Sequence, residues 1–79
     1  MEIKEYTTRD MYLAAAFMAE GVKYLKADRT DPKKMLFVFE DNGEADRINA
    51  QWANATLVIS ATSFADALRR IKSIIHSDS

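Results

Sequence analysis

The stretch Met11-Tyr-Leu-Ala-Ala-Ala-Phe-Met-Ala19 is apolar throughout, and it decides the fold. It is too short to span a bilayer, which takes about 20 residues. Thr7 and Asp10 resemble a capping box at its start, and Gly21 is a natural stop for a helix that ends near Glu20. A helix that covers a core from one side keeps a polar face, and this one has none. The stretch therefore predicts a helix that is buried on most sides or faces another subunit.

Two segments rich in aromatic and β-branched residues follow, at 22–28 and 35–39, with the turn signal Asp31-Pro32 between them. Together they predict a β-hairpin. The second segment is apolar on both faces, so we expect this strand to be central in a sheet or covered on both sides. Residues 2–6 are a candidate third strand.

Two more helices are expected in the second half of the chain. The first spans about 44–54 after a turn at 40–43, and residues 57–59 form a short extended piece behind it. Its inner face repeats at helical spacing and consists of Ala45, Ile48, Trp52 and Ala55. The last helix is capped by Ser60, Thr62 or Ser63, and its apolar face consists of Phe64, Leu68, Ile71 and Ile75.

The order of these elements is (β)-α-β-β-α-(β)-α, in which helices and a hairpin are segregated. This order predicts an α+β fold, a small antiparallel β-hairpin or sheet packed by three helices. The length of 79 residues allows a single domain over 1–79.

The composition excludes several classes of protein. The chain has 11 Lys and Arg against 12 Asp and Glu, and a net charge of -1 argues against binding to nucleic acid or anionic lipid by bulk charge. Without cysteine there is no disulfide, thiol nucleophile or cysteine metal site. The N-terminus has no secretory signal, so we expect a soluble, cytoplasmic protein with no membrane partner.

The sequence also argues against an enzyme, because it has no glycine-rich phosphate loop, HExxH or GxSxG motif. The only histidine, His76, falls near the end of the last helix, where a surface cation is favoured by the helix dipole. We therefore expect no catalytic residue, metal, cofactor or small-molecule substrate. The acidic cluster at 40–46 lacks the EF-hand spacing and is explained by stabilisation of a helix start or by docking of a basic partner.

Two interaction surfaces remain as alternatives. The first is apolar and suits a protein partner, and its candidate residues are Met11, Tyr12, Phe17 and Trp52. The spacing of Trp52 favours a place in the core over an interface anchor. The second is basic and suits nucleic acid, and its candidate residues are Lys23, Lys26, Arg29, Lys33, Lys34, Arg69 and Arg70. Lysines on edge strands also prevent aggregation between sheets, which is the simpler explanation.

We expect a non-catalytic interaction or accessory module that self-associates as a homodimer or binds a host or phage protein. A small nucleic-acid-binding protein is the alternative, and it is not favoured. If the basic residues share one exposed face, nucleic acid gains support. If they are scattered or paired with the acidic cluster at 40–46, the protein-interaction module gains support.

Four segments resemble one family of short proteins. The first segment is 6–10 together with 12–15, and the second is Gly21 with the lysine-bearing strand after it. The third is 37–41, and the fourth is 58–64 together with 67–68 and 72–75. In this order and spacing they are similar to the domain of unknown function 5659 family, whose members occur in bacterial genomes, prophages and mobile elements. The resemblance implies a phage or mobile-element setting and supplies no activity. The chain departs from it at Trp52-Ala-Asn-Ala55, where members often have Tyr-x-Asn-Gly, so the turn after the second helix is left open.

Overall fold

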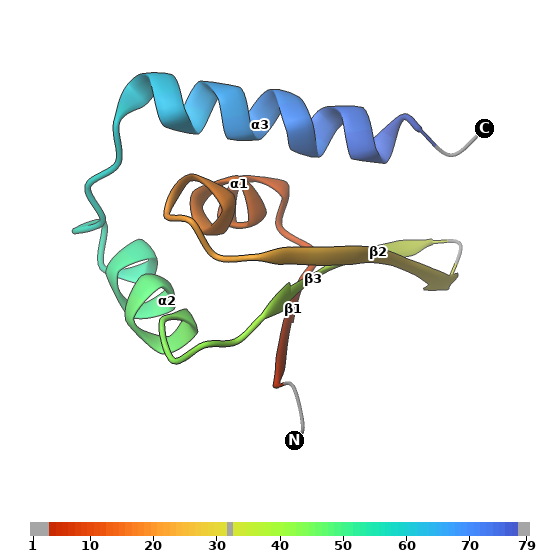
Figure 1. Ribbon diagram of the computed structural model, residues 1–79, viewed down its shortest axis with the longest axis horizontal. Coiled ribbons are helices and arrows are strands. Elements are labelled where there is room, and N and C mark those ends of the chain that lie inside the picture. The colour runs from red at the N-terminus through yellow and green to blue at the C-terminus, as the bar shows by residue number, and fades with distance from the viewer. Residues whose placement is uncertain (1–3, 32, 78–79) are drawn as a thin grey trace.

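A computed structural model describes residues 4–31 and 33–77 of the chain. Its helices and strands are, in order, β1 (Glu5–Thr8), α1 (Met11–Ala19), β2 (Tyr24–Asp31), β3 (Lys34–Glu40), α2 (Ala45–Ala53) and α3 (Ala61–Ile75) (Figure 1). This is the predicted α+β fold. The candidate third strand is present as β1, at 5–8 instead of 2–6, and residues 2–3 of that prediction lie outside the described residues. Residues 57–59 form the connection between α2 and α3 instead of a strand. Pro32, at the predicted turn, lies outside the described residues.

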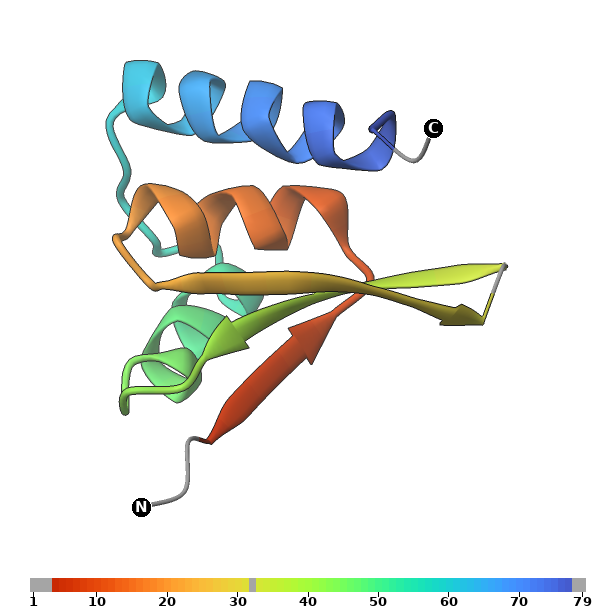
Figure 2. The same ribbon diagram turned by 45° about the vertical axis from the view of Figure 1, so that its right-hand side comes forward.

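The sheet is antiparallel with the strand order β1-β3-β2, which confirms that β3 is central. Directly opposite residues share a face, so the pairs of Phe39 with Tyr6 and with Tyr24 place three aromatic rings on one side. Phe37 lies on the same side of the sheet. Helix α1 covers this side, and α3 lies outside α1 (Figure 2). The pairing of Val38 with Lys26 places both on the other face, which these two helices leave uncovered.

Helix α1 is the middle layer of the molecule, between the sheet and α3 (Figures 1 and 2). Five consecutive residues, Leu13 to Phe17, are buried, and the three alanines among them are 0% exposed. Successive residues of a helix point about 100° apart, so the three alanines face different neighbours. Side chains that end at Cβ let both the sheet and α3 approach α1 closely. The first of the two alternatives for this helix, burial on most sides, is confirmed. Its burial requires no second subunit.

The start of α1 differs from the prediction. Thr7 lies in β1, where it pairs with Val38, so it is not available as a helix cap. Asp10 is itself the N-cap, and its Oδ1 accepts hydrogen bonds from the backbone N–H of Tyr12 (2.9 Å) and Leu13 (3.2 Å). The predicted capping box was therefore wrong by three residues, because strand pairing keeps the chain extended as far as Thr8.

The end of α1 matches the prediction. Gly21 has a φ of +86° and donates to the carbonyl of Met18 (3.1 Å), and Val22 donates to the carbonyl of Phe17 (3.0 Å). These two bonds form a Schellman motif, which satisfies the last carbonyls of the helix and needs a left-handed residue at the position of Gly21. The chain then turns directly into β2.

Helix α2 ends in the same motif, with alanine where the glycine would stand. Ala55 has a φ of +58° and donates to the carbonyl of Trp52 (3.1 Å), and Thr56 donates to that of Gln51 (2.8 Å). Ala45 and Ile48 are buried on the inner face as predicted, and Trp52 is half-buried against the core. The placement of Ala55 on that face was wrong, because it lies beyond the end of the helix and is exposed.

Ala55→Gly is expected to raise the free energy of unfolding by about 0.5 to 1 kcal/mol. A left-handed conformation costs a non-glycine residue about 1 to 2 kcal/mol, and the greater entropy that glycine loses on folding offsets only part of this. Urea unfolding followed by the fluorescence of Trp52 measures the change. Ala53→Gly, inside the same helix, is the control and should lower stability. Equal losses of unfolding free energy from Ala55→Gly and Ala53→Gly would contradict the argument that Ala55 is strained by its left-handed conformation.

Helix α3 is positioned as its apolar pattern indicates. Ser60 is the N-cap and its Oγ accepts from the N–H of Ser63. Ile71 is 0% exposed, and Phe64, Leu68 and Ile75 are half-buried against the same core. Phe17 is at the centre, where its ring lies 4.8 Å from that of Tyr6 and 5.3 Å from that of Phe39, measured between centroids.

Candidate functional site

A groove is lined by residues from the start of α1, the β2–β3 hairpin and the end of α3. Figure 1 shows where these three segments lie. The volume of the groove is about 700 Å³. The buried and half-buried residues that line it are apolar, except for Thr8, and form its floor: Met11, Met35, Phe37 and Ile75. The exposed residues that line it are charged and form its rim: Arg9, Asp10, Lys33 and Lys34. We name this the hairpin groove.

The rim of the hairpin groove is effectively basic. Its one carboxylate, Asp10, already accepts two backbone hydrogen bonds as the N-cap of α1. In the part of the chain that the structure describes, the ion pairs are made by Arg47 and Arg69 and by none of the rim cations. Arg9, Lys33 and Lys34 therefore present their charges to the solvent above an apolar floor.

Contacts across the fold hold the walls of the hairpin groove in place. The guanidinium of Arg29, on β2, donates to the carbonyl oxygen of Ile74 and so fastens the end of α3 to the hairpin. In the hairpin, Thr30 donates to Asp28 (2.9 Å) and Lys33 to Asp31 (2.9 Å) through their backbone N–H groups. The hydrogen bonds from the side chain and backbone of Thr30 hold the pKa of the Asp28 carboxyl below its usual value.

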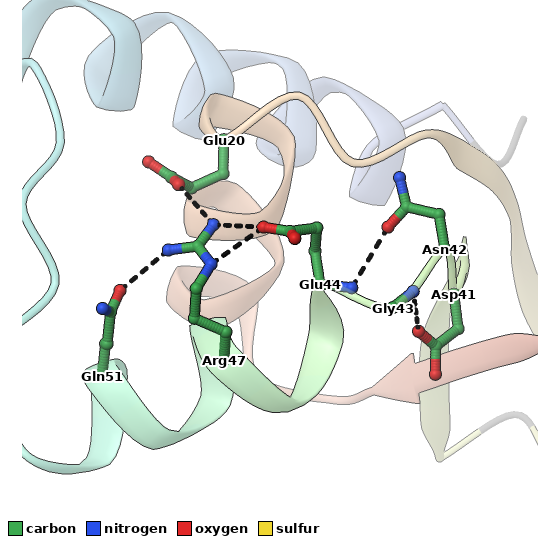
Figure 3. A network of polar contacts seen from close by, with 7 residues as sticks. All are labelled: Glu20, Asp41, Asn42, Gly43, Glu44, Arg47 and Gln51. Atoms are coloured by element: carbon green, nitrogen blue, oxygen red, sulfur yellow. Dashed lines mark hydrogen bonds and ion pairs between the residues drawn. The ribbon is translucent and has the colours of Figure 1, made fainter.

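The acidic cluster forms a different structure at the opposite end of β3 (Figure 3). The guanidinium of Arg47 bonds Glu44 (2.8 Å from Nε), Glu20 (3.1 Å) and Gln51 (2.9 Å), and so joins the end of α1 to α2. The hydrogen bonds to Glu44 and Glu20 raise the pKa of Arg47. Asp41 accepts from the N–H of Gly43 (3.0 Å) in the turn before α2. These bonds fix the turn before α2 and join α2 to α1, and the side chain of the N-cap Glu44 makes no capping hydrogen bond. The acidic residue in the first turn of α2 is Asp46, which is favoured there by the helix dipole. In residues 4–31 and 33–77, no three acidic or histidine side chains gather as metal ligands would.

A second apolar surface lies at the connection between α2 and α3. Gln51, Trp52, Ala55 and Leu57 line a shallow hollow of about 280 Å³. The next residue, Val58, is 87% exposed and points away from the core. We name Trp52, Ala55, Leu57 and Val58 the connection patch.

The structure separates the four residues predicted for a protein interface. Trp52 belongs to the connection patch, Met11 lines the hairpin groove, and Tyr12 is 51% exposed on α1. Phe17 was wrongly included, because it is 0% exposed and stacks on Tyr6 inside the core. Sequence reasoning missed Val58, since one valine in a short extended segment gives no signal of its exposure.

The basic residues do not share one face. Lys33 and Lys34 lie at the tip of the hairpin, whereas Lys23 lies at its other end, where its carbonyl accepts from the N–H of Glu40 (2.9 Å). Lys26 is on the face of the sheet that α1 and α3 leave uncovered. The side chain of Arg29 is hydrogen-bonded to the carbonyl oxygen of Ile74 at the end of α3.

The remaining two, Arg69 and Arg70, are exposed on α3, on the far side of α1 from the sheet (Figure 2). Arg69 pairs there with Asp66 of the same helix. Neither arginine pairs with the acidic cluster at 40–46 in the described part of the chain. The basic residues are therefore scattered, which is the arrangement expected of a protein-interaction module.

Among the described residues, no helix combines the length and the apolarity that a membrane span requires. Comparison with curated proteins and with solved structures finds no significant match. One family model matches residues 3–77 of the 79, the four resembling segments included, and its description is Domain of unknown function (DUF5659). Because the match covers nearly the whole length, the chain belongs to the DUF5659 family.

Proposed function

We propose that this protein is a non-catalytic protein-interaction module and that two copies associate through the connection patch. The observation that carries the proposal is Val58, whose side chain is 87% exposed beside the hollow that Trp52 lines. Exposed apolar surface next to a tryptophan is typical of an interaction site. Helix α1 is buried by its own chain, and Val58 is the most exposed large apolar side chain among the described residues.

The shape of the connection patch suits a second copy. A projecting side chain lies directly beside a hollow, so a two-fold axis near Val58 would seat each valine in the hollow of the other copy. An interface in which both copies use the same surface is the commonest arrangement in homodimers.

The expected dimer is weak. Burying an exposed valine contributes about 1.5 to 3 kcal/mol, and association costs an estimated 4 to 15 kcal/mol of lost freedom. A standard interface takes about 800 Å² per partner, which is about a seventh of the 5453 Å² surface of the chain. The connection patch alone is smaller, and two buried valines do not offset the cost of association, so the dimer must also cover Trp52 and Leu57. With that contribution we expect a dissociation constant in the upper micromolar range.

The non-catalytic part of the proposal is supported by where the titratable groups lie. In residues 4–31 and 33–77 no polar or charged residue is buried, so no acid or base is held in a water-excluded site. Burial raises the pKa of Tyr24, and the charge of Arg29 opposes this shift. The ring of Tyr24 packs against Phe39 at the edge of the core, so we assign Tyr24 a packing role and not a catalytic one. His76 is exposed at the end of α3. A cytoplasmic, phage or mobile-element setting, with a host or phage protein as a further partner, completes the proposal.

Val58→Asp is expected to weaken self-association at least tenfold, because it places a charge where an apolar side chain would be buried. Sedimentation velocity at about 10 to 500 μM, the range of the expected constant, measures this. The stability of the monomer should change by less than about 0.5 kcal/mol, since the side chain contacts little of its own chain. Ser73→Asp adds the same charge near the other end of α3 and is the matched control.

A wild-type chain that stays monomeric at about 500 μM would contradict self-association, and so would equal behaviour of the two variants. The nucleic-acid alternative has less support, because the basic residues are scattered. A mixed oligonucleotide added to the same samples tests it, with binding expected to fall steeply with salt if it occurs.

A further inference from the structure

We propose that the hairpin groove binds a short acidic protein segment that inserts an apolar side chain. This surface is separate from the connection patch: it is formed by β3, the hairpin tip, the start of α1 and the last turn of α3, whereas the patch lies between α2 and α3. The inference therefore stands whether or not the chain self-associates. It assigns the hairpin groove a ligand class, an acidic peptide.

The charges around the hairpin groove select for acidic groups. Arg9, Lys33 and Lys34 are exposed on its rim, and the carboxylate of Asp10 is already bonded to the first turn of α1. The rim carries three positive charges and one negative charge on a chain whose net charge is -1. Complementary charge of this kind guides association and rejects partners of the same sign.

The floor of the hairpin groove selects for an apolar side chain. Met11, Met35 and Ile75 are half-buried there, so each keeps apolar surface that a ligand can cover. Two methionines in one floor adapt to side chains of different shape, because methionine is flexible and polarizable. The groove is open along one side, and a site that buries a small molecule encloses most of it. An open basic groove with an apolar floor suits a segment of polypeptide better.

The same residues argue against single-stranded nucleic acid as the ligand. Bases are bound by stacking on exposed aromatic rings, and the one ring in the hairpin groove, that of Phe37, is only 2% exposed. Lys26, another cation that could follow a phosphate backbone, lies on the other face of the sheet, beside Val38.

The hairpin groove exists before any ligand binds. The bond from Arg29 to the carbonyl of Ile74 holds the last turn of α3, and therefore Ile75, against the hairpin. Asp31 pairs with Lys34 across the tip and accepts from the N–H of Lys33, which fixes the backbone from which the two lysine side chains extend. A preformed site loses less entropy on binding than one that must order itself.

The test uses the full chain and a fluorescein-labelled peptide of about 12 residues in which glutamate and leucine alternate, long enough to cross the groove when extended. Three matched peptides replace glutamate by glutamine, glutamate by lysine, or leucine by serine. Fluorescence anisotropy should show binding of the first peptide that weakens with salt, and binding at least tenfold weaker for each of the others. The serine peptide tests the apolar anchor without altering the protein.

The protein variants locate the site. Lys33→Glu with Lys34→Glu should weaken binding of the glutamate–leucine peptide at least tenfold, whereas Arg69→Glu with Arg70→Glu, an equal change of charge on α3, should weaken it less than threefold. Far-UV circular dichroism confirms that both double variants are folded. Val58→Asp should bind the peptide as the wild type does, which separates this proposal from self-association.

Any one of four results would overturn the proposal. One is equal weakening by the two double variants, which would mean bulk attraction only. Another is equal binding of the serine peptide, which would remove the apolar anchor. The third is an oligonucleotide of about 12 nucleotides that binds in place of the acidic peptide and depends on Lys33 and Lys34. Amide shifts in an NMR titration should fall at 8–11, 33–37 and 75, and shifts confined to other residues would also contradict it.

Discussion

Phe17→Ala is expected to lower the free energy of unfolding by about 3 to 5 kcal/mol, which is the usual loss for a buried phenylalanine. The ring is 0% exposed and stacks on Tyr6, and its centroid lies 5.3 Å from that of Phe39, so the substitution opens a cavity between α1 and the sheet. A domain of this length has a total stability of about 4 to 12 kcal/mol. The variant should therefore lose between about a quarter of this stability and all of it.

The matched control is Tyr12→Ala, which removes an aromatic ring from the same helix at a position that is 51% exposed. Its expected loss is less than about 1 kcal/mol, because little of the ring is packed. Urea unfolding, followed by the single tryptophan and by circular dichroism, measures both variants. Similar losses for the two would show that α1 is not held between the sheet and α3 as described.

Ala15→Leu is the second substitution with a large expected effect, a loss of about 1 to 3 kcal/mol or more. Ala15 is 0% exposed in the middle layer, with the sheet on one side of α1 and α3 on the other. The larger side chain must displace one of these two layers, because Ala15 is fully buried. Leucine has a high helix propensity, so the expected loss of stability comes from packing and not from the helix itself.

Ala50→Leu is its control, because it makes the same change at an exposed position in the middle of α2. That variant should stay within about 0.5 kcal/mol of the wild type. Thermal unfolding by circular dichroism compares them. A wild-type melting temperature for Ala15→Leu would mean that the neighbours of Ala15 leave room for a larger side chain, contrary to its complete burial between the sheet and α3.

The fold was largely predictable because its strongest signals are local. The apolar stretch at 11–19 indicated a helix covered on most sides, and apolar residues on both faces of 35–39 indicated a central strand. The start of α1 was predicted wrongly, since pairing with β3 decides that Thr7 is in a strand, and that contact is distant in the sequence.

The candidate surfaces were only partly predictable. Lys33 and Lys34 were proposed for nucleic acid and Met11 for a protein partner, yet the fold brings all three to one groove together with Ile75. Such a site combines segments far apart in the chain, and no local pattern records their meeting. Arg29 shows the same limit, because its bond to the carbonyl of Ile74 spans 45 positions.

The place of α1 as the middle layer has a consequence for synthesis on the ribosome. Its outer cover, α3, ends at Ile75, which is 56 residues after Ala19. Translation at about 5 to 20 residues per second takes roughly 3 to 11 s to cover that distance. During this time the apolar helix α1 of the emerging chain is not covered by α3, and chaperones bind exposed apolar segments of this kind. Folding of this protein is therefore completed only after its last helix has left the exit tunnel.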